Sequence, residues 1–446
     1  MPRPPRKPQP KPNARKGPPS PPQQRQTARR IAPNEKIMLD ITDMAQDGLA
    51  IGRAGKERVF LPYAIPGEQV EARITHVSDK AIFAEGARML DASLDRVNAR
   101  CEHFGRCWGC QWQHIEYKAQ VILKFDVLAD QLGRMGKMSD ALLTRVLKQV
   151  IPSADIWGYN WRMMFVPADD GRLALHTRDG RALERINTCH ILHPELLALY
   201  DSLDMDFSDS KRVHLMRGEH DEMMLVLEME NEILPQLISD MRLSVNVILP
   251  DREPLNIMGD TNLTYMINGV PMRVTVGSAF RSNIGQTTRL AQEVVKAARL
   301  KGGENVLDAY AGVGVFAAQL AGKAAHVTLI ESYPPAATDA EVNLEAFDEV
   351  TIIEGTVEDT LASMIESEMT FDVAVVDPPS TGLSDEAREQ LAATCGRIVY
   401  VSSNPLTFAR DATYFMQQGY DLLQIQPLDF APHTYYVETV SVLERR

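Results

Sequence analysis

The stretch Val306-Leu-Asp-Ala-Tyr-Ala-Gly-Val-Gly-Val-Phe316 decides the fold. An apolar run ends at Asp308, a glycine-rich turn follows, and a helical pattern begins, which predicts a strand–turn–helix unit. Gly312 and Gly314 would let the backbone approach a nucleotide, because no Cβ stands in the way. The third glycine of a dinucleotide fingerprint is missing, so the pattern does not favour pyrophosphate binding. Glu331 ends the next predicted strand and could accept both ribose hydroxyls of an adenosine; the alternative is a tight turn followed by an exposed glutamate.

The region around this stretch, from about Pro271 to the C-terminus, alternates between strand and helix patterns. The predicted strands are Val306–Asp308, Val327–Ile330, Val350–Ile353, Val373–Asp377, Ile398–Ser402 and Thr439–Leu443. This alternation predicts a doubly wound, Rossmann-like α/β domain, in which ligands bind beyond the carboxyl ends of the strands.

The composition of the whole chain is that of a globular protein. Its 446 residues suffice for about three domains, with 44% apolar and 24% charged residues. No run approaches the roughly 18 continuous apolar residues of a membrane helix, so we expect no membrane segment. Five cysteines are too few for a disulfide scaffold, and no secretory signal opens the chain. We therefore expect a cytoplasmic protein, and a monomer.

Charge is distributed unevenly along the chain. The net charge is −13, which taken alone argues against a nucleic-acid partner. However, residues 1–33 hold nine basic residues, no acid and eleven prolines, which leaves −22 on the remainder. Prolines at this density predict an extended, disordered chain. This tail is either an electrostatic arm for RNA or a solubilising segment without a specific contact.

Residues 34–93 have the pattern of a small β domain. The segments Lys36–Ile41, Glu57–Leu61, Glu68–His76 and Ala81–Ala87 alternate as strands, and glycines at positions 48, 55 and 67 mark the turns between them. About 60 residues of this kind suggest a five-stranded barrel of the OB type, a fold that often binds RNA.

A cysteine array follows the predicted barrel. Cys101, Cys107 and Cys110 form a C-x5-C-x2-C pattern, and Cys189 lies far downstream. Four thiolates can hold an iron–sulfur cluster or a zinc ion, and spacing alone does not separate the two. Between the cysteines, one helical face is predicted from the apolar residues Ile115, Ala119, Ile122, Phe125, Leu128 and Leu132.

These motifs, in this order, resemble the RNA 5-methyluridine (uracil-C5) methyltransferases that carry an N-terminal TRAM domain. The matching stretches of the barrel region are Asp47-Gly-Leu-Ala-Ile-Gly, Val59-Phe-Leu-Pro and Ile65-Pro-Gly-Glu68. The cysteine array matches together with Gln113 and Tyr117. The C-terminal matches are the glycine loop, Glu331, Asp377-Pro-Pro, Ser402-Ser-Asn-Pro405, Ala409-Arg-Asp411 and Val437-Glu-Thr-Val440.

The resemblance implies a multidomain protein with three folded parts. It implies an OB-like TRAM barrel over 34–93, a central α+β iron–sulfur domain over 94–270 and a class I methyltransferase domain over 271–446. It implies S-adenosyl-L-methionine as methyl donor, a 4Fe-4S cluster (zinc being the alternative) and a structured ribosomal or transfer RNA as substrate. The implied cluster ligands are Cys101, Cys107, Cys110 and Cys189.

The resemblance also assigns roles in the C-terminal domain. The donor site would be formed by Arg281, Tyr310, Gly312, Gly314, Glu331 and Asp377. In the family, a cysteine adds to carbon 6 of uracil, carbon 5 attacks the donor methyl group, and a glutamate removes the carbon-5 proton. Glu438 stands at the position of that base, but Ser403 stands at the position of the nucleophile.

Two further positions depart from the family pattern in the same region. Arg281 replaces an expected glutamine, and Ser380 replaces the arginine that usually follows Asp-Pro-Pro. Because a serine hydroxyl needs an adjacent base to become a nucleophile, three hypotheses follow. The chain is a uracil-C5 methyltransferase, a catalytically silent RNA chaperone or assembly factor, or a methyltransferase that transfers directly to a nucleophilic atom.

Overall fold

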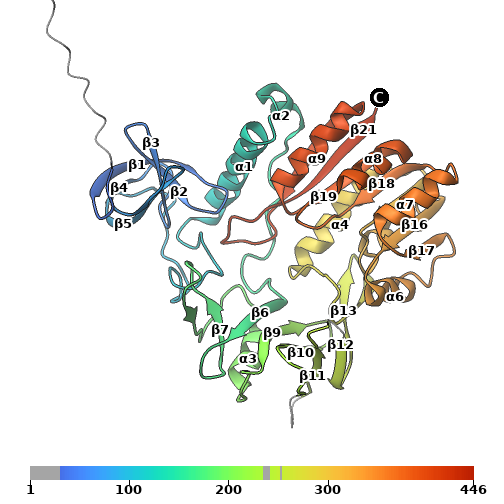
Figure 1. The fold of residues 1–446 in the computed structure, drawn as a ribbon, viewed down its shortest axis with the longest axis horizontal. Coiled ribbons are helices and arrows are strands. Elements are labelled where there is room, and N and C mark those ends of the chain that lie inside the picture. The colour runs from blue at the N-terminus through green and yellow to red at the C-terminus, as the bar shows by residue number, and fades with distance from the viewer. Residues whose placement is uncertain (1–30, 235–241, 252–253) are drawn as a thin grey trace, which may run out of the picture.

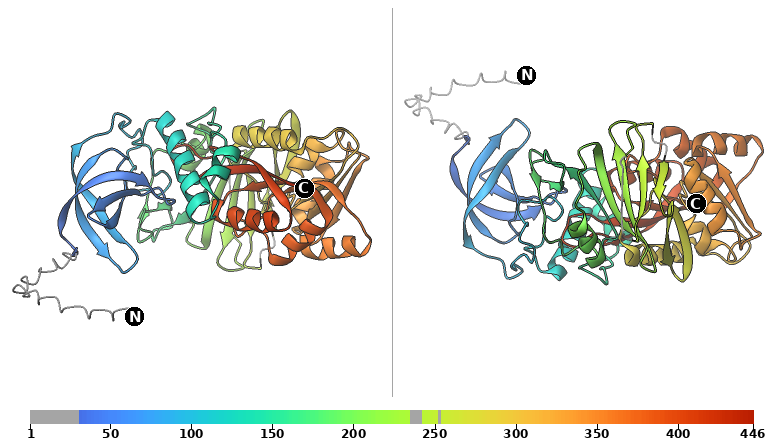
Figure 2. Two further views of the ribbon diagram at one scale, coloured as in Figure 1. Left: turned by 90° about the horizontal axis from the view of Figure 1, so that it is seen from above. Right: turned by 90° about the horizontal axis from the view of Figure 1, so that it is seen from below.

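The computed structural model describes residues 31–234, 242–251 and 254–446. A closed β barrel lies at one end of an elongated molecule, one seven-stranded sheet lies in the middle, and a second lies at the other end (Figures 1 and 2). Residues 1–30, which include most of the predicted disordered tail, lie outside the described residues. In the described ranges, no helix combines the length and apolarity needed to cross a membrane.

The N-terminal barrel has the five strands expected of an OB-like domain, in the order β1-β2-β3-β5-β4. The strands are β1 (Lys36–Met44), β2 (Ala50–Ala54), β3 (Glu57–Leu61), β4 (Gln69–Val77) and β5 (Ile82–Asp91). The sequence pattern missed β2, because Ala50, Ile51 and Gly52 are all buried and show no alternation between apolar and polar positions.

The middle sheet has the order β12-β11-β10-β9-β6-β7-β8 and packs against one short helix. Its strands are β6 (Arg162–Pro167), β7 (Leu173–His176), β8 (Leu183–Glu184), β9 (Ser210–Arg217), β10 (Met223–Met229), β11 (Ser244–Ile248) and β12 (Pro254–Met258), and the helix is α3 (Pro194–Ser202). A hairpin of β13 (Asn262–Ile267) and β14 (Val270–Thr275) connects this part to the C-terminal sheet.

The C-terminal sheet has the order β17-β16-β15-β18-β19-β21-β20. Its strands are β15 (Asn305–Ala309), β16 (His326–Glu331), β17 (Val350–Glu354), β18 (Phe371–Val376), β19 (Cys395–Ser402), β20 (Tyr420–Leu428) and β21 (Glu438–Arg445). The first five are parallel, and β21 inserts antiparallel between β19 and β20. Six strands were predicted; β20 was missed, because Gln424, Gln426 and Pro427 interrupt its apolar pattern.

Helices cover both faces of this sheet (Figure 1). They are α4 (Ile284–Ala298), α5 (Val315–Leu320), α6 (Pro334–Asn343), α7 (Val357–Glu366), α8 (Asp385–Thr394) and α9 (Pro405–Gln417). Neighbouring residues of β15 serve opposite cores: Val306 packs into the cluster with α4 and α5, and Leu307 into the cluster with α7, α8 and α9. The carboxyl edge of the sheet is thus held from both sides.

Helices α1 (Tyr117–Arg134) and α2 (Asp140–Val146) also pack on the C-terminal sheet, although they precede the middle sheet in the chain. The helix predicted around Ile115–Leu132 is present, but the assignment of Ile122 to its buried face was wrong, since Ile122 is 60% exposed. The buried face includes Gln120 and Lys124 instead. The buried face of α1 therefore packs against a polar segment of the chain, where an apolar one was expected.

That segment is the connection from β20 to β21, residues 429–437. Lys124 is completely buried and donates from Nζ to Asp429 Oδ1 (2.5 Å) and to the carbonyls of Ala431 (3.0 Å) and Tyr436 (2.7 Å). The carbonyl of His433 accepts from the backbone amides of Gln111 (3.0 Å) and Trp112 (2.9 Å), directly after the cysteine array. The segment that leads into Glu438 is therefore fastened to the N-terminal half of the chain.

Candidate active site

A cavity of about 580 Å³ opens at the carboxyl edge of the C-terminal sheet. It contains seven of the eight residues predicted from the sequence for the donor and catalytic sites, namely Arg281, Tyr310, Gly312, Glu331, Asp377, Ser403 and Glu438. Gly314 does not line it. These residues come from the ends of five strands and from the segment before α4, so the fold collects at one edge residues that the sequence spreads over more than 150 positions.

The glycine loop has a left-handed backbone, with φ of 60° at Tyr310, 56° at Gly312 and 83° at Gly314. The two glycines have different structural roles. A Cβ at Gly312 would face almost open space beside the cavity, whereas one at Gly314 would lie 3.1 Å from Leu344 and 3.3 Å from Leu329. Gly312 keeps the cavity accessible, and Gly314 lets the loop pack closely against β16 and the end of α6.

Glu331 is fixed by two backbone amides. Oε2 accepts from Gly312 (2.8 Å) and Oε1 accepts from Tyr333 (2.7 Å). Each carboxylate oxygen has a second acceptor site, so both can still accept a hydroxyl from a ligand in the cavity. The carboxylate is therefore preorganised next to the glycine loop, where the sequence placed it.

Asp308 lies beneath the glycine loop and is fully buried. Its Oδ2 accepts from the amide of Ala317 (2.8 Å), while Oδ1 has no hydrogen-bond partner among the described residues. Burial raises the pKa of Asp308 to about 8, and the nearby carboxylates of Asp377 and Glu331 add to the increase, against the lowering effect of the Ala317 amide. We therefore expect Asp308 to be largely protonated at neutral pH.

Arg281 forms a bridge between two carboxylates in the cavity. Its Nη1 and Nη2 donate to Asp377 Oδ2 (2.8 Å) and Oδ1 (2.9 Å), and its Nε donates to Glu438 Oε2 (2.8 Å). Asp377 follows β18 and Glu438 opens β21, so the bridge crosses the end of β19, which lies between them. We call these three residues the carboxylate bridge. The sequence predicted Arg281 as a donor contact and gave no sign of this pairing.

In the carboxylate bridge, burial and neighbouring charges act together on the pKa values of Arg281 and Glu438. The Arg281 side chain is 24% exposed and that of Glu438 is 14% exposed. Burial alone would lower the pKa of Arg281, but Asp377 and Glu438 outweigh it and the net pKa is raised, so the guanidinium stays charged. Burial raises the pKa of Glu438; Arg281 opposes that increase and Asp377 adds to it. Glu438 is thus a stronger base than an exposed glutamate.

Ser403 lies directly after β19, at the end of the strand that the carboxylate bridge crosses. The last pair between β19 and β21 is Ser402 with Thr439, so Ser403 and Glu438 each adjoin that pair, and both line the cavity. The side chain of Ser403 is exposed and makes no hydrogen bond to another described residue. The residues that line the cavity include no histidine, lysine or cysteine. Within the described part of the chain, the cavity therefore supplies no base for Ser403 other than carboxylates.

Cys395 does not replace the missing nucleophile. It opens β19, at the opposite end of the strand from Ser403, as its position in the sequence predicted. It is buried, and burial raises the pKa of its thiol to about 12. A thiol in that state is not reactive at neutral pH.

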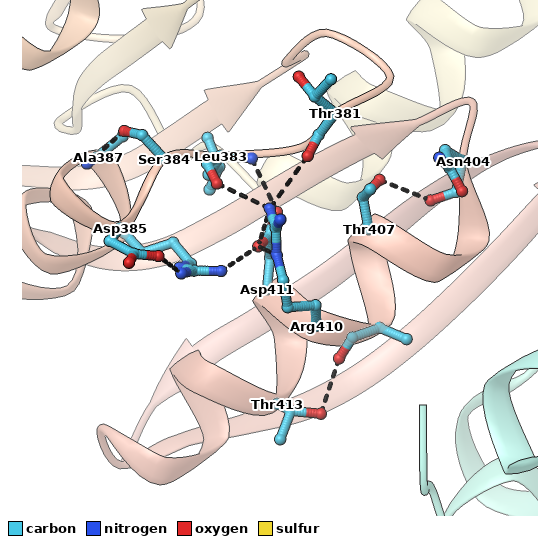
Figure 3. A network of polar contacts seen from close by, with 12 residues as sticks. Thr381, Leu383, Ser384, Asp385, Ala387, Asn404, Thr407, Arg410, Asp411 and Thr413 are labelled. Carbon is cyan, nitrogen blue, oxygen red and sulfur yellow. Dashed lines mark hydrogen bonds and ion pairs between the residues drawn. The ribbon is translucent and has the colours of Figure 1, made fainter. Parts of the chain in front are cut away.

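The loop after Asp377 is held in place by a buried ion network around Asp411 (Figure 3). Asp411 accepts from the amide of Leu383 (2.9 Å), the hydroxyl of Tyr400 (2.7 Å) and the guanidinium of Arg388 (2.8 Å). Arg410 donates to the carbonyl of Leu383 (2.8 Å). The Ala409-Arg-Asp411 motif therefore shapes the wall of the cavity without contacting its interior, and sequence reasoning missed Arg388 and Tyr400.

The four cysteines of the array lie within electrostatic reach of one another. Burial raises the pKa of Cys189 to about 11, and Cys107 and Cys101 add to the increase. Burial also raises the pKa of Cys110, on which Gln113 has the opposite effect through a hydrogen bond to the thiol. Gln113 also accepts from the amide of Cys101 (3.0 Å), and Gly109 donates its amide to Cys107 Sγ (3.3 Å). Each ionised thiol raises the pKa of its neighbours, so a multivalent cation bound among them would stabilise the thiolate forms.

A zinc ion and a four-iron cluster would place different demands on the four cysteines. Across the described ranges, no group of three or more His, Cys, Asp or Glu side chains could hold a metal ion. A single tetrahedral zinc at about 2.3 Å from each sulfur would draw the four thiolates into close contact. A four-iron cluster distributes its thiolate ligands around a larger core. Either group would need all four cysteines, which the described ranges bring within electrostatic reach of one another.

Known proteins resemble this chain over most of its length. A model of the tRNA (uracil-5-)-methyltransferase family matches residues 273–446. An uncharacterized RNA methyltransferase of Streptomyces avermitilis is 31% identical over 427 residues, which cover 92% of this chain and 98% of that protein. One of Listeria monocytogenes serotype 4b is 30% identical over 448 residues, with the same coverage.

A solved structure shares the fold over most of the chain. It is the Pyrococcus abyssi tRNA (uracil-54, C5)-methyltransferase in complex with S-adenosyl-L-homocysteine. The TM-score is 0.69 at 24% sequence identity, covering 91% of this chain and 100% of that chain. At this identity the likeness concerns the fold.

Proposed function

Because this chain belongs to the uracil-C5 RNA methyltransferase family, we propose that it transfers a methyl group from S-adenosyl-L-methionine to carbon 5 of a uridine in ribosomal or transfer RNA. One observation carries the proposal: the preorganised Glu331 and the largely buried Glu438 line the same cavity. The carboxylate of Glu331 can accept the ribose hydroxyls of an adenosine, and the carboxylate of Glu438 can accept a proton. The family relationship favours this enzyme over the silent RNA-binding alternative.

The donor side of the cavity is formed by the glycine loop and Glu331. S-adenosyl-L-methionine supplies the methyl group when bound. The carboxylate of Glu331 would accept the ribose hydroxyls, and the open backbone at Gly312 would admit the nucleoside. Both carboxylate oxygens of Asp377 accept hydrogen bonds from Arg281, so the role of Asp377 is to hold Arg281 rather than to contact the donor directly.

The substrate side is formed by Glu438 and Ser403. Oε2 of Glu438 is held by Arg281, which leaves Oε1 to accept the carbon-5 proton of the uracil. The target base would have to leave its stack to reach this cavity. Ser403 lines the same cavity as Glu438, at the position from which the family's nucleophile would attack carbon 6. A serine there makes the covalent step slow, because the only bases that line the cavity are carboxylates, and Glu438 is already held by Arg281.

We further propose that the remaining parts serve RNA binding and stability. The barrel over 34–93 would act as the TRAM domain and contact RNA, aided by the basic residues of 1–33. The region 94–270 would carry a 4Fe-4S cluster on Cys101, Cys107, Cys110 and Cys189, and 271–446 would form the class I methyltransferase domain. The protein would act as a monomer in the cytoplasm.

We expect Glu331→Ala to weaken binding of S-adenosyl-L-methionine by about 10- to 150-fold, the equivalent of 1.5–3 kcal/mol for hydrogen bonds to a charged group. Calorimetry measures the affinity directly. Glu354→Ala is the matched control, because Glu354 ends the neighbouring strand opposite Glu331 and does not line the cavity. No binding by the unaltered protein would contradict the donor site.

We expect iron in the anaerobically purified protein, with the broad visible absorption of a thiolate-bound cluster. Cys189→Ser should lose most of the iron, because it removes one of four ligands. Cys395→Ser should keep it, since Cys395 lies in the core of the C-terminal sheet. Stoichiometric zinc without iron would contradict the cluster.

The reaction itself is tested by mapping 5-methyluridine in ribosomal and transfer RNA, by mass spectrometry, from cells with and without this protein. Loss of one 5-methyluridine at a defined position supports the proposed function and names the target. Unchanged modification, together with donor binding, would favour direct transfer to another atom.

A further inference from the structure

Two neighbouring tyrosines form an exposed aromatic surface just before Glu438. The rings of Tyr435 and Tyr436 stack with centroids 4.5 Å apart and planes inclined by 25°, and their hydroxyls are hydrogen-bonded at 3.3 Å. Tyr436 is 52% exposed, and in the described ranges no other aromatic residue is found among the exposed large hydrophobic side chains. We call Tyr435 and Tyr436 the tyrosine pair.

The tyrosine pair is rigid, unlike an ordinary surface side chain. Tyr435 packs on the barrel, where a Cβ at Gly48 would come within 2.8 Å of its ring. The carbonyl of Tyr436 accepts from the buried Lys124 (2.7 Å), and its amide donates to Thr434 Oγ1 (3.2 Å). A ring held in this way binds a partner at a lower entropic cost than a mobile one. Figure 1 shows the connection before β21 extending from the C-terminal sheet toward the barrel.

The tyrosine pair also lies close to Glu438, because Tyr436 precedes Glu438 by two residues. Exposure alternates over residues 436–438, with Val437 buried between the exposed Tyr436 and the partly exposed Glu438. Side chains two positions apart in extended backbone share one side and are about 6.6 Å apart. That separation is comparable with one nucleotide step in an extended single strand.

We propose that the tyrosine pair is a stacking platform for the unpaired nucleobase adjacent to the target nucleotide. The inference rests on the proposed function, because it takes RNA as the substrate. When a target base leaves its stack, the neighbouring base loses a stacking partner. The exposed ring of Tyr436 replaces that partner while the target reaches Glu438. Aromatic stacking accepts any base, so the platform stabilises the opened RNA without selecting its sequence.

The test uses a short single-stranded oligouridylate that carries one 2-aminopurine, whose fluorescence falls when it stacks. Tyr436→Ala should weaken binding about 5- to 150-fold and abolish the quenching. Tyr436→Phe keeps the ring and should bind within about 3-fold of the unaltered protein. Ile365→Ala, an exposed apolar residue on α7, is the control and should change neither readout.

Each outcome bears on a distinct claim. S-adenosyl-L-homocysteine should bind all three variants equally, which shows that they are folded. Equal RNA affinity and equal quenching for Tyr436→Ala would overturn the platform and leave the proposed function intact. A loss as large in Tyr436→Phe would assign the effect to the hydroxyl and also overturn it. If the unaltered protein binds S-adenosyl-L-homocysteine but not the RNA probe, the platform is overturned, whereas the proposed function is tested separately by 5-methyluridine in the cellular RNA.

Discussion

Ser403→Cys should raise the rate of methyl transfer to uridine by orders of magnitude. A cysteine thiol with a pKa of about 8.5 is a few per cent thiolate at neutral pH, whereas a serine hydroxyl is essentially un-ionised. The structure strengthens this expectation, because the cavity around Ser403 offers no histidine or lysine that could activate the hydroxyl. Transfer of a labelled methyl group to unmodified RNA, followed by nucleoside analysis, measures the rate.

The same variant should form a stable covalent adduct with RNA that contains 5-fluorouridine, because fluorine cannot leave carbon 5 as a proton does. The unaltered protein should form none. Ser332→Cys is the matched control, since it places a thiol in the same cavity but at the end of β16, which β15 and β18 separate from β19. If the unaltered protein traps the RNA as well as Ser403→Cys does, another residue is the nucleophile and the active site has been assigned wrongly.

Glu438→Gln, introduced together with Ser403→Cys, should lower turnover by about 10²- to 10⁴-fold, the usual contribution of a general base. Methyl transfer precedes proton removal, so the first step should survive. RNA without fluorine should therefore accumulate as a methylated covalent adduct. Denaturing electrophoresis with labelled donor detects that adduct.

The control for this variant is Glu444→Gln, which alters the other glutamate of β21 at the far end of the strand, where it pairs with Arg397. It should leave turnover unchanged. Full turnover by the Glu438→Gln variant would show that another group takes the proton. Loss of both turnover and adduct would show instead that Glu438 is needed to hold Arg281 and the cavity.

Strand pattern and glycine placement predicted most of the C-terminal sheet, because parallel strands buried on both faces appear as short apolar runs. The edge at which Asp377, Ser403 and Glu438 meet also followed from the order of strands and helices. The carboxylate bridge could not be predicted in this way. Arg281 lies 96 residues from Asp377 and 157 from Glu438 in the sequence, and nothing local to any of them indicates the pairing.

Helix α1 shows a second limit of pattern reasoning. Apolar spacing identified the helix but placed Ile122 on the buried face, and the structure buries Lys124 instead. A lysine is usually a surface residue, so only its distant partner Asp429 explains its burial. The β strand Tyr420–Leu428 was missed for a similar reason, since its pairing with β21 compensates for its polar residues.

The position of β21 has a consequence for biosynthesis. Glu438 begins the last strand of the sheet, and that strand fills an interior gap between β19 and β20. During translation, Glu331 and the glycine loop leave the ribosome more than 100 residues before Glu438 does. A nascent chain could thus assemble the donor side of the cavity well before the proton acceptor. Before Glu438 is synthesised, Arg281 and Asp377 therefore lack the second carboxylate that completes the carboxylate bridge.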